Sequence, residues 1–249
     1  MEQNNNIYLS VIIPAYNEAE RIEATLRRTG EYLRAKDFLS EVIVVVDGAK
    51  DATAAVAQKL SGEISNLRVI DRKENRGKGY TVREGMLAAQ GSVRVFTDAD
   101  NSTDIAHFDL MKPLFDCGEQ VVIASREPKD APGAKQSVAQ KWYKRLLGDM
   151  GNLFIQIVAV RGIWDTQCGF KAFSAAASDK IFSRSRIDRW GFDIEALALA
   201  HKFGYKIAKI PADWKNDPRS HVRMSAYFQV LWETVKIRWW LMTGQYNGS

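Results

Sequence analysis

The sequence predicts an α/β protein with a mostly parallel sheet flanked by helices. Over the first hundred residues, short runs of β-branched apolar residues alternate with segments of helical periodicity. Val42–Val46 is an unbroken apolar run, which suits a strand buried on both faces of a sheet. Strands that alternate with helices at this spacing indicate βαβ units.

Local patterns justify the elements of the first half one by one. The expected strands are short runs of Val, Ile and Leu, and the expected helices repeat apolar residues every three to four positions. An alanine-rich helix is expected to begin with Asp51 as its N-cap. In chain order we expect Leu9–Ile13, a helix through Ile22, Leu26 and Leu33, Val42–Val46, Asp51–Leu60, Leu67–Ile70, Gly79–Ala89 and Val93–Thr97.

The second half has a less regular pattern. We expect strands at Gln120–Ala124, Phe170–Ser174 and Lys206–Pro211, and helices within Val138–Val160 and at Phe192–Phe203. Prolines and glycine mark residues 126–136 as a loop, and 213–224 is expected to be another. Because no repeat or linker interrupts the chain, we expect a single domain, residues 1–224, followed by a C-terminal amphipathic helix, residues 225–249.

Composition narrows the class of protein. Hydrophobic residues make up 46% of the 249 residues and charged residues 26%, so a large core can form. The net charge of +5 is compatible with nucleic acid, an anionic membrane or a phosphorylated ligand, and does not choose among them. Cys117 and Cys168 stand far apart, which favours a reducing compartment over a disulfide framework. With neither a secretory signal nor a long uncharged apolar stretch in this sequence, we expect a cytoplasmic protein.

Four polar segments follow the first four expected strands. They are Pro14–Glu18, Asp47–Asp51, Asn75–Gly79 and Asp98–Asp100. Ligands of open parallel sheets gather at the carboxyl ends of the strands, where loops meet the amino ends of helices. The four segments are therefore expected to form one site.

Asp98 and Asp100 are the expected metal ligands of this site. Residues two apart in an extended segment point to the same side, so both carboxylates can reach one cation. Carboxylate oxygens suit Mg²⁺ or Mn²⁺, which usually also bind substrate phosphates. The alternative is a solvated turn before a helix that begins near Asp104, and the three other polar segments favour the metal.

Four motifs, taken in chain order, resemble those of the family-2 glycosyltransferases of GT-A fold. They are Val11–Glu18, Asn75–Gly79, Asp98–Asp100 and Asp165–Lys171. The likeness is to the branch that charges polyprenyl phosphates, which includes dolichyl-phosphate glucosyltransferases and mannose synthases. It implies a GT-A (Rossmann-like) domain and an inverting transfer of a hexose, glucose or mannose. The implied donor is a nucleotide-diphosphate sugar, and the implied acceptor is a polyprenyl phosphate such as dolichyl or undecaprenyl phosphate.

The resemblance also implies roles for individual residues. Those expected to bind the nucleotide sugar are Pro14, Tyr16, Glu18, Asp47, Lys78 and Asp98. Those expected on the phosphate and acceptor side are Arg126, Gln167, Lys171, Arg219, His221 and Arg223. The expected catalytic residues are Asp98, Asp100 and Asp193. A phosphate acceptor is already ionised at neutral pH, so Asp193 is expected to orient the site rather than to act as a general base.

Three positions depart from the family pattern. Val46 stands where the pattern has the first of two adjacent acids, and Ala49 stands where it has Ser or Thr. His221 replaces a lysine in the segment that closes over the donor in relatives. The departures at Val46 and Ala49 leave the donor base open, and the departure at His221 leaves Arg219 and Arg223 as the nearest fixed cations of that segment.

The sequence leaves two alternative functions open and excludes a third. The same fold could serve a soluble, protein or glycan acceptor, or a non-catalytic nucleotide-sugar-binding module, although the intact Asp98/Asp100 pair argues against the latter. A dinucleotide-binding oxidoreductase needs a Gly-x-Gly-x-x-Gly segment after the first strand, and Pro14–Glu18 contains no glycine. No nucleic-acid partner is expected, and no oligomeric state follows from the sequence.

The C-terminal segment offers a route to a lipid acceptor. Six apolar side chains recur there at helical spacing: Phe228, Leu231, Trp232, Val235, Trp239 and Met242. Tryptophans with interleaved Lys and Arg suit a helix that lies in a membrane interface, beside an apolar part of residues 150–160. The alternative is a helix packed on the core. We expect peripheral attachment to anionic lipid at the cytoplasmic face of a membrane.

Overall fold

The computed structural model describes residues 6–136, 142–214 and 224–247. The strands are β1 (Leu9–Ala15), β2 (Ser40–Asp47), β3 (Leu67–Arg72), β4 (Val93–Thr97), β5 (Val121–Ser125), β6 (Lys135–Gln136), β7 (Phe170–Ser174), β8 (Ile207–Pro211) and β9 (Asp213–Trp214). The α-helices are α1 (Ile22–Arg34), α2 (Thr53–Lys59), α3 (Lys78–Ala88), α4 (Phe108–Asp116), α5 (Trp142–Val158), α6 (Ala175–Phe182), α7 (Phe192–Lys202) and α8 (Met224–Met242). Two short 3-10 turns, η1 (Leu60–Gly62) and η2 (Ile105–His107), complete the order.

The main sheet has seven strands in the order β3-β2-β1-β4-β7-β5-β8. The pairs β3-β2, β2-β1 and β1-β4 are parallel, and so is β5-β8. Only β7, within this sheet, runs against its neighbours, since it pairs antiparallel with both β4 and β5. The prediction of a mostly parallel sheet is confirmed.

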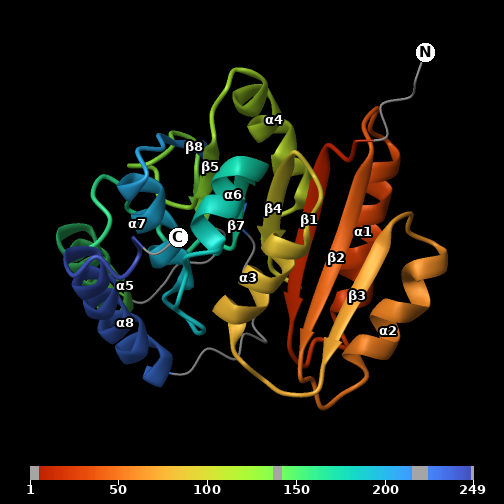
Figure 1. The fold of residues 1–249 in the computed structure, drawn as a ribbon, viewed down its shortest axis with the longest axis horizontal. Coiled ribbons are helices and arrows are strands. Elements are labelled where there is room, and N and C mark those ends of the chain that lie inside the picture. The colour runs from red at the N-terminus through yellow and green to blue at the C-terminus, as the bar shows by residue number, and fades with distance from the viewer. Residues whose placement is uncertain (1–5, 137–141, 215–223, 248–249) are drawn as a thin grey trace.

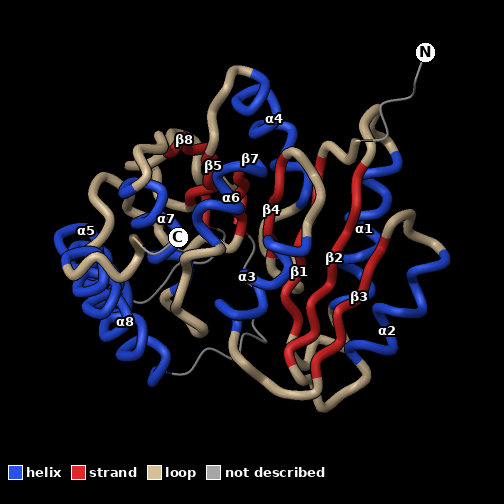
Figure 2. Tube along the Cα trace, viewed as in Figure 1, coloured by secondary structure: helices blue, strands red, loops and turns tan. Residues whose placement is uncertain are grey.

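Helices cover both faces of this sheet (Figure 1). Alternate residues of the central strands point to opposite faces: Val11 and Ile13 of β1 belong to the core cluster beneath α1, α2 and α4, whereas Ile12 belongs to the cluster beneath α3, α6 and α7. Figure 2 shows the same three layers, with α5 and α8 together at the far side from β3. Both clusters are continuous, which is why one domain suffices for the whole sheet.

The antiparallel β7 decides which segments meet. Thr97, the last residue of β4, pairs with Phe170, the first residue of β7. The chain that leaves β4 and the chain that enters β7 therefore lie at the same edge of the sheet. That edge also holds the carboxyl ends of β1, β2, β3, β5 and β8.

The predicted strands Val93–Thr97 and Phe170–Ser174 have the bounds of β4 and β7, and other expected elements differ by a few residues at their ends. The assignment of Asp51 as N-cap was wrong: Ala52 occupies that position, and Asp51 accepts hydrogen bonds from the amide and hydroxyl of Thr53 instead. Helix α6 and the short β6–β9 pair were not predicted. Within the described residues, no helix is both long and apolar enough to cross a bilayer.

Candidate active site

The four polar segments of the first half do lie at one edge of the sheet, the lower edge in Figure 1. Each lies at the carboxyl end of its strand: Tyr16 follows β1, Asp47 is the last residue of β2, Asn75 lies beyond β3 and Asp98 follows β4. The parallel pairing of β3, β2, β1 and β4 brings them together. This arrangement is the ligand-binding edge expected of an open α/β sheet.

The first two segments are tied to each other by hydrogen bonds. Asn17 adopts a left-handed backbone, with φ of 55°, and its Oδ1 accepts from the amide of Lys50 at 2.8 Å. The amide of Glu18 donates to the Thr53 hydroxyl at 2.8 Å, and that of Ala19 donates to Asp51 at 3.1 Å. Tyr16 stays 42% exposed beside this junction. Its ring is therefore available to a ligand, whereas Pro14 is buried within β1.

Asp47 fixes the third segment. It is buried, and its carboxylate accepts from the amides of Arg76 and Gly77, each at 2.8 Å, and from Arg72 at 2.6 Å. Three donors occupy the carboxylate, so its role in the described structure is to shape the loop that carries Lys78. Contact between Asp47 and a base or ribose stays a prediction.

Lys78 and Asp98 form an ion pair across the site, with 2.5 Å between Nζ and Oδ1. Each side chain keeps about a quarter of its surface exposed, at 27% and 30%. Burial alone would lower the pKa of Lys78, but the nearby carboxylates of Asp98, Asp193 and Asp100 outweigh it and raise the pKa. The ammonium group is therefore charged at neutral pH and faces a group of acids.

The acidic side chains at this edge lie close enough for the charges of Asp98 and Asp100 to affect the pKa of Glu18. Burial raises the pKa of Glu18, the ion pair with Arg21 opposes it, and the charges of Asp100 and Asp98 raise it further. Asp100 accepts a hydrogen bond from the amide of Ser102 at 2.9 Å. The turn continues through Asn101, which is left-handed with φ of 54°.

Asp98 and Asp100 fit a hard divalent cation by their chemistry, because each offers carboxylate oxygens at the ligand-binding edge. Among the described residues, however, no group of three or more His, Cys, Asp or Glu side chains is arranged to hold a metal. A cation held by these two acids would need its other ligands from water or from the phosphates of a donor, as Mg²⁺ commonly takes them.

Residues before β7 complete the other side of the site. Gly169 lies against the Asp98 carboxylate so closely that a Cβ there would overlap it. Arg126, after β5, makes a two-pronged ion pair with buried Asp165, with both contacts at 2.8 Å. Gln167 is exposed, and its backbone amide donates to the same Asp165 carboxylate at 3.3 Å. The predicted positions Arg126, after β5, and Gln167, before β7, are therefore both held at Asp165.

Lys171 and Asp193 form a second ion pair, inside the protein. Both side chains are buried, and Nζ of Lys171 donates to Asp193 at 2.5 Å and to the carbonyl of Cys168. Burial raises the pKa of Asp193, and the charge of Lys171 only partly opposes this. The charge of Lys171 is thus paired with Asp193, and direct phosphate binding by Lys171 stays a prediction.

Arg219, His221 and Arg223 lie outside the described residues.

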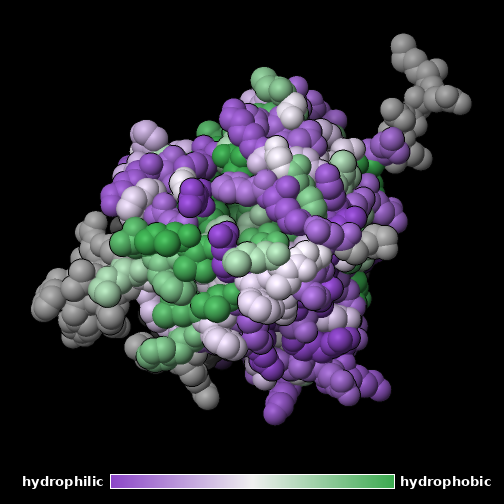
Figure 3. Space-filling view, turned by 60° about the vertical axis from the view of Figure 1, so that its left-hand side comes forward, coloured by the Kyte–Doolittle hydropathy of each residue, from purple (hydrophilic) through white to green (hydrophobic). Residues whose placement is uncertain are grey.

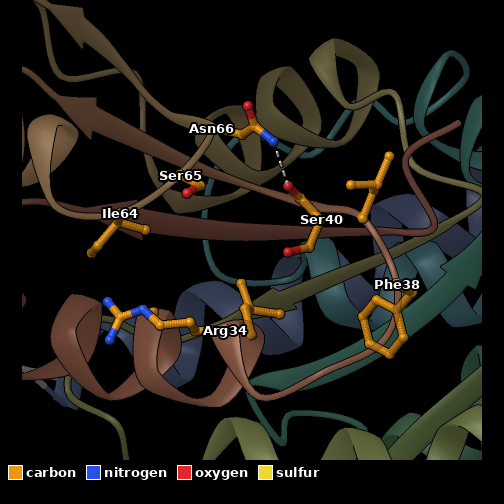
Figure 4. Close-up of a pocket in the computed structure, with 9 residues that line it drawn as sticks. Arg34, Phe38, Ser40, Ile64, Ser65 and Asn66 are labelled. Atoms are coloured by element: carbon orange, nitrogen blue, oxygen red, sulfur yellow. Dashed lines mark hydrogen bonds between the residues drawn. The ribbon is translucent and has the colours of Figure 1, made fainter. Parts of the chain in front are cut away.

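A separate hollow of about 180 Å³ opens among α1, the start of β2 and the turn before β3 (Figure 4). Phe38, Ser40 and Asn66 line it, at the amino ends of the strands and thus at the opposite edge from Asp98. It is not part of the candidate site.

The fold and the site are those of an α/β protein with a charged ligand-binding edge at the carboxyl ends of its parallel strands, and comparison with known proteins gives its family. The profile of Glycosyl transferase family 2 matches residues 10–182, so the chain belongs to that family. It is 34% identical to a dolichyl-phosphate beta-glucosyltransferase of Dictyostelium discoideum, over 96% of this chain and 76% of the relative. It is 37% identical to the Homo sapiens protein of that name, over 83% of this chain and 67% of the relative.

Solved structures support the fold. The chain is similar to glucosyl-3-phosphoglycerate synthase from Mycobacterium tuberculosis in complex with uridine diphosphate, with a TM-score of 0.68 and 21% identity. That similarity covers 93% of this chain and 80% of the other. The prediction of a family-2 glycosyltransferase with a GT-A fold is confirmed.

Sequence reasoning missed several residues that build the site. Asn17 and Thr53 join the first two loops, and Arg72 helps to hold Asp47. The position of Asn17 inside the first polar segment was a usable signal, since Asn tolerates a left-handed backbone. Arg72 gave none, because its partner is 25 residues away in sequence.

Proposed function

We propose that this glycosyltransferase moves a hexose, glucose or mannose, from a nucleotide-diphosphate sugar to a polyprenyl phosphate such as dolichyl phosphate. The main support is that Lys78, Asp98 and Asp100 meet at one edge of the sheet. Arg126, after β5, and Gly169, before β7, lie at the same edge. The named relatives support this acceptor, since they are dolichyl-phosphate beta-glucosyltransferases aligned over most of the chain. The departures at Val46 and Ala49 keep the donor base open.

In the proposed reaction, the acceptor oxygen attacks the anomeric carbon from the face opposite the nucleotide, and inversion follows. Tyr16 and Glu18 would frame the base and ribose, and Asp47 would keep the Lys78 loop in place. Lys78 would offer its charge to the departing diphosphate, where negative charge develops. Asp193 would orient Lys171 and the floor of the sugar site from inside the protein.

We propose Mg²⁺ or Mn²⁺ as the cofactor, held by Asp98 and Asp100, and it would neutralise the leaving diphosphate. The donor chemistry of these two carboxylates supports the proposal. So does a structure of similar fold, solved with Mn²⁺, uridine diphosphate and glucosyl-3-phosphoglycerate.

The test is a transfer assay with UDP-glucose and GDP-mannose, each with dolichyl phosphate, free dolichol or no acceptor. We expect a β-linked product from an α-linked donor, formed only with the lipid phosphate. Transfer to free dolichol but not to its phosphate would show that the acceptor assignment is wrong. An α-linked product would contradict the single displacement.

We further propose that residues 225–249 hold the protein at an anionic membrane surface. Helix α8 is apolar on two opposite sides, a pattern that differs from a simple amphipathic helix. Ala226, Val230 and Ile237 are buried against the core. The other side carries the predicted stripe, and its exposed members are Phe228, Trp232, Val235, Trp239 and Met242.

The exposed stripe is part of a larger apolar surface. Helix α5 packs beside α8 and exposes Met150, Leu153, Phe154 and Ile157. In Figure 3 green side chains gather on the side of the molecule that bears these helices. Lys236 and Arg238 are exposed and fall on either flank of the stripe at 3.6 residues per turn. Apolar side chains flanked by cations fit the interface of an anionic bilayer.

Substitution of the stripe tests this proposal without removing the buried side of α8. We expect Trp232→Ser with Trp239→Ser to abolish sedimentation with liposomes that contain phosphatidylserine, while nucleotide binding is retained. Leu110→Ser is the matched control, since Leu110 is an exposed apolar residue on α4. Equal sedimentation of the wild type and the double variant would exclude the stripe as the docking surface.

A further inference from the structure

Helix α8 contacts the start of α7 through a buried carboxylate, Glu233. Its Oε2 accepts a hydrogen bond from the amide of Gly191 at 2.6 Å, and its Oε1 accepts from Gln229 at 2.9 Å. The contact requires glycine at position 191, because a Cβ there would lie 2.8 Å from Cβ of Glu233. Glu233 and Gly191 are thus fitted to each other.

Gly191 is the N-cap residue of α7 and offers no side chain to cap the helix. The Glu233 carboxylate lies at this amino end, where the helix dipole favours negative charge. Asp193, in the first turn of α7, holds buried Lys171. Lys171 in turn is paired in the sheet with Phe96 of β4, two residues before Asp98. A shift of the first turn of α7 would therefore move the Asp193–Lys171 pair beneath the site.

A second contact fastens the end of the chain to the same helix. Tyr246 is buried and its hydroxyl donates to Glu195 at 2.7 Å. Glu195 also accepts from the amides of Arg186 and Ile187. The C-terminal segment therefore holds α7 at two points, through Gly191 and through Glu195.

The segment 185–191 then carries the contact to the donor side of the site. The carbonyl of Asp188 accepts from the amide of Tyr80 at 3.1 Å, and Arg83 binds the Asp188 carboxylate at 2.6 Å. Gly77 and Gly79 allow α3 to approach this segment so closely that a Cβ at either position would collide with its backbone. Between those glycines is Lys78, the partner of Asp98.

We propose that Glu233 is a positioning residue for sugar transfer: from α8 it fixes the start of α7, and so sets the Asp193–Lys171 pair and the segment behind Lys78. The role rests on the proposed transferase function. Together with the proposed membrane contact, it would make α8 a single element whose exposed side faces lipid and whose buried side supports the active site. A buried carboxylate is costly unless its acceptor oxygens are used, and Glu233 uses both.

Three variants test the role in detergent, with dolichyl phosphate saturating and the nucleotide sugar varied. Glu233→Met keeps the length of the side chain and removes the acceptor, and we expect kcat to fall at least tenfold while KM for the donor stays within about twofold. Glu233→Gln keeps an acceptor for Gly191 and should remain within about threefold of the wild type. Glu63→Gln, on the surface, is the control and should change nothing.

These kinetics separate positioning from simple loss of folding. Unfolded protein would lower the number of nucleotide-binding sites, so kcat is expressed per site counted by nucleotide titration. An unchanged kcat in Glu233→Met, or an equal loss in Glu233→Gln, would overturn the proposal.

Hydrogen exchange gives a readout that does not depend on the substrate. We expect faster exchange in Glu233→Met at the amides of residues 191–193 and 78–80, and no change there in Glu63→Gln. Tyr246→Phe should raise exchange at residues 186–187 through loss of its bond to Glu195. Unchanged exchange in Glu233→Met would overturn the coupling. A wild type that transfers no hexose, with these exchange effects present, would instead count against the proposed function alone.

Discussion

Replacing Gly169 by alanine is the most selective perturbation that the structure offers. The added methyl group would overlap the carboxylate of Asp98 and leave the backbone of β7 untouched. Asp98 is partly exposed and can rotate away, so the free energy of unfolding should fall by less than the ~1–3 kcal/mol typical of an overpacked core. Rotation, however, breaks the 2.5 Å contact with Lys78 and moves an expected metal ligand.

The expected loss of activity is much larger than the loss of stability. Removal of one preorganised electrostatic contact at a reacting centre costs about 10²–10³ in kcat, or ~3–4 kcal/mol. We expect Gly169→Ala to lose at least tenfold in kcat, measured by release of nucleoside diphosphate, with a nearly unchanged urea midpoint. Gly62→Ala is the matched control, because a Cβ there meets nothing within 4 Å. Activity within twofold of the wild type would refute the assigned position of Asp98.

Three further predictions follow from the same edge of the sheet. Asp100→Ala should lower kcat by about a hundredfold or more, with Asp37→Ala, at an exposed position, as the control. Excess EDTA should abolish transfer by the wild type, and full activity in EDTA would exclude the metal. Asp47→Asn, which weakens the acceptor for two loop amides, should cost ~1–3 kcal/mol in urea unfolding and weaken nucleotide binding measured by calorimetry; unchanged binding would contradict its role in shaping the Lys78 loop. Burial alone would raise the pKa of Asp165, but the charge and hydrogen bonds of Arg126 outweigh burial and lower it. The free energy of unfolding that this ion pair contributes at neutral pH should therefore decline as the pH falls below the ordinary value of 3.8. An Asp165→Asn protein with the same decline would show that the Asp165–Arg126 pair is not its cause.

Much of the fold could be predicted because several central strands, among them β1, β2 and β4, are buried on both faces. Val42–Val46 has no polar residue, and Val93–Thr97 runs directly into the Asp98 motif, so strand type and loop position were both visible. The polar segments after four parallel strands then had to share one edge. That rule placed Tyr16, Asp47, Lys78 and Asp98 together without any knowledge of side-chain contacts.

Sequence patterns could not reveal the partner of each charged side chain. Asp47 and Lys171 were expected to face ligands, yet Asp47 is held by Arg72 and two amides, and Lys171 lies wholly inside the protein against Asp193. Pairing across 22 or 25 residues depends on register and helix packing. Likewise, the helical spacing of the stripe on α8 could be recognised in the sequence. Apolar residues also lie on the opposite side of the helix, so the spacing alone did not show which side packs on the core.

The position of Gly169 beside Asp98 follows from the one strand that breaks the parallel rule. If β7 ran parallel to β4, its entry would lie at the amino edge, far from the Asp98 motif. Because β7 is antiparallel, Phe170 pairs with Thr97, and the segment from Asp165 to Gly169 reaches the edge that β1 to β4 have already formed. The same reversal places Lys171, the second residue of β7, close to this edge, where it pairs with Asp193 at the start of α7. The parallel strands of the sheet thus supply one side of the candidate site, and its single reversed strand brings the opposite side and the buried Lys171–Asp193 pair to the same edge.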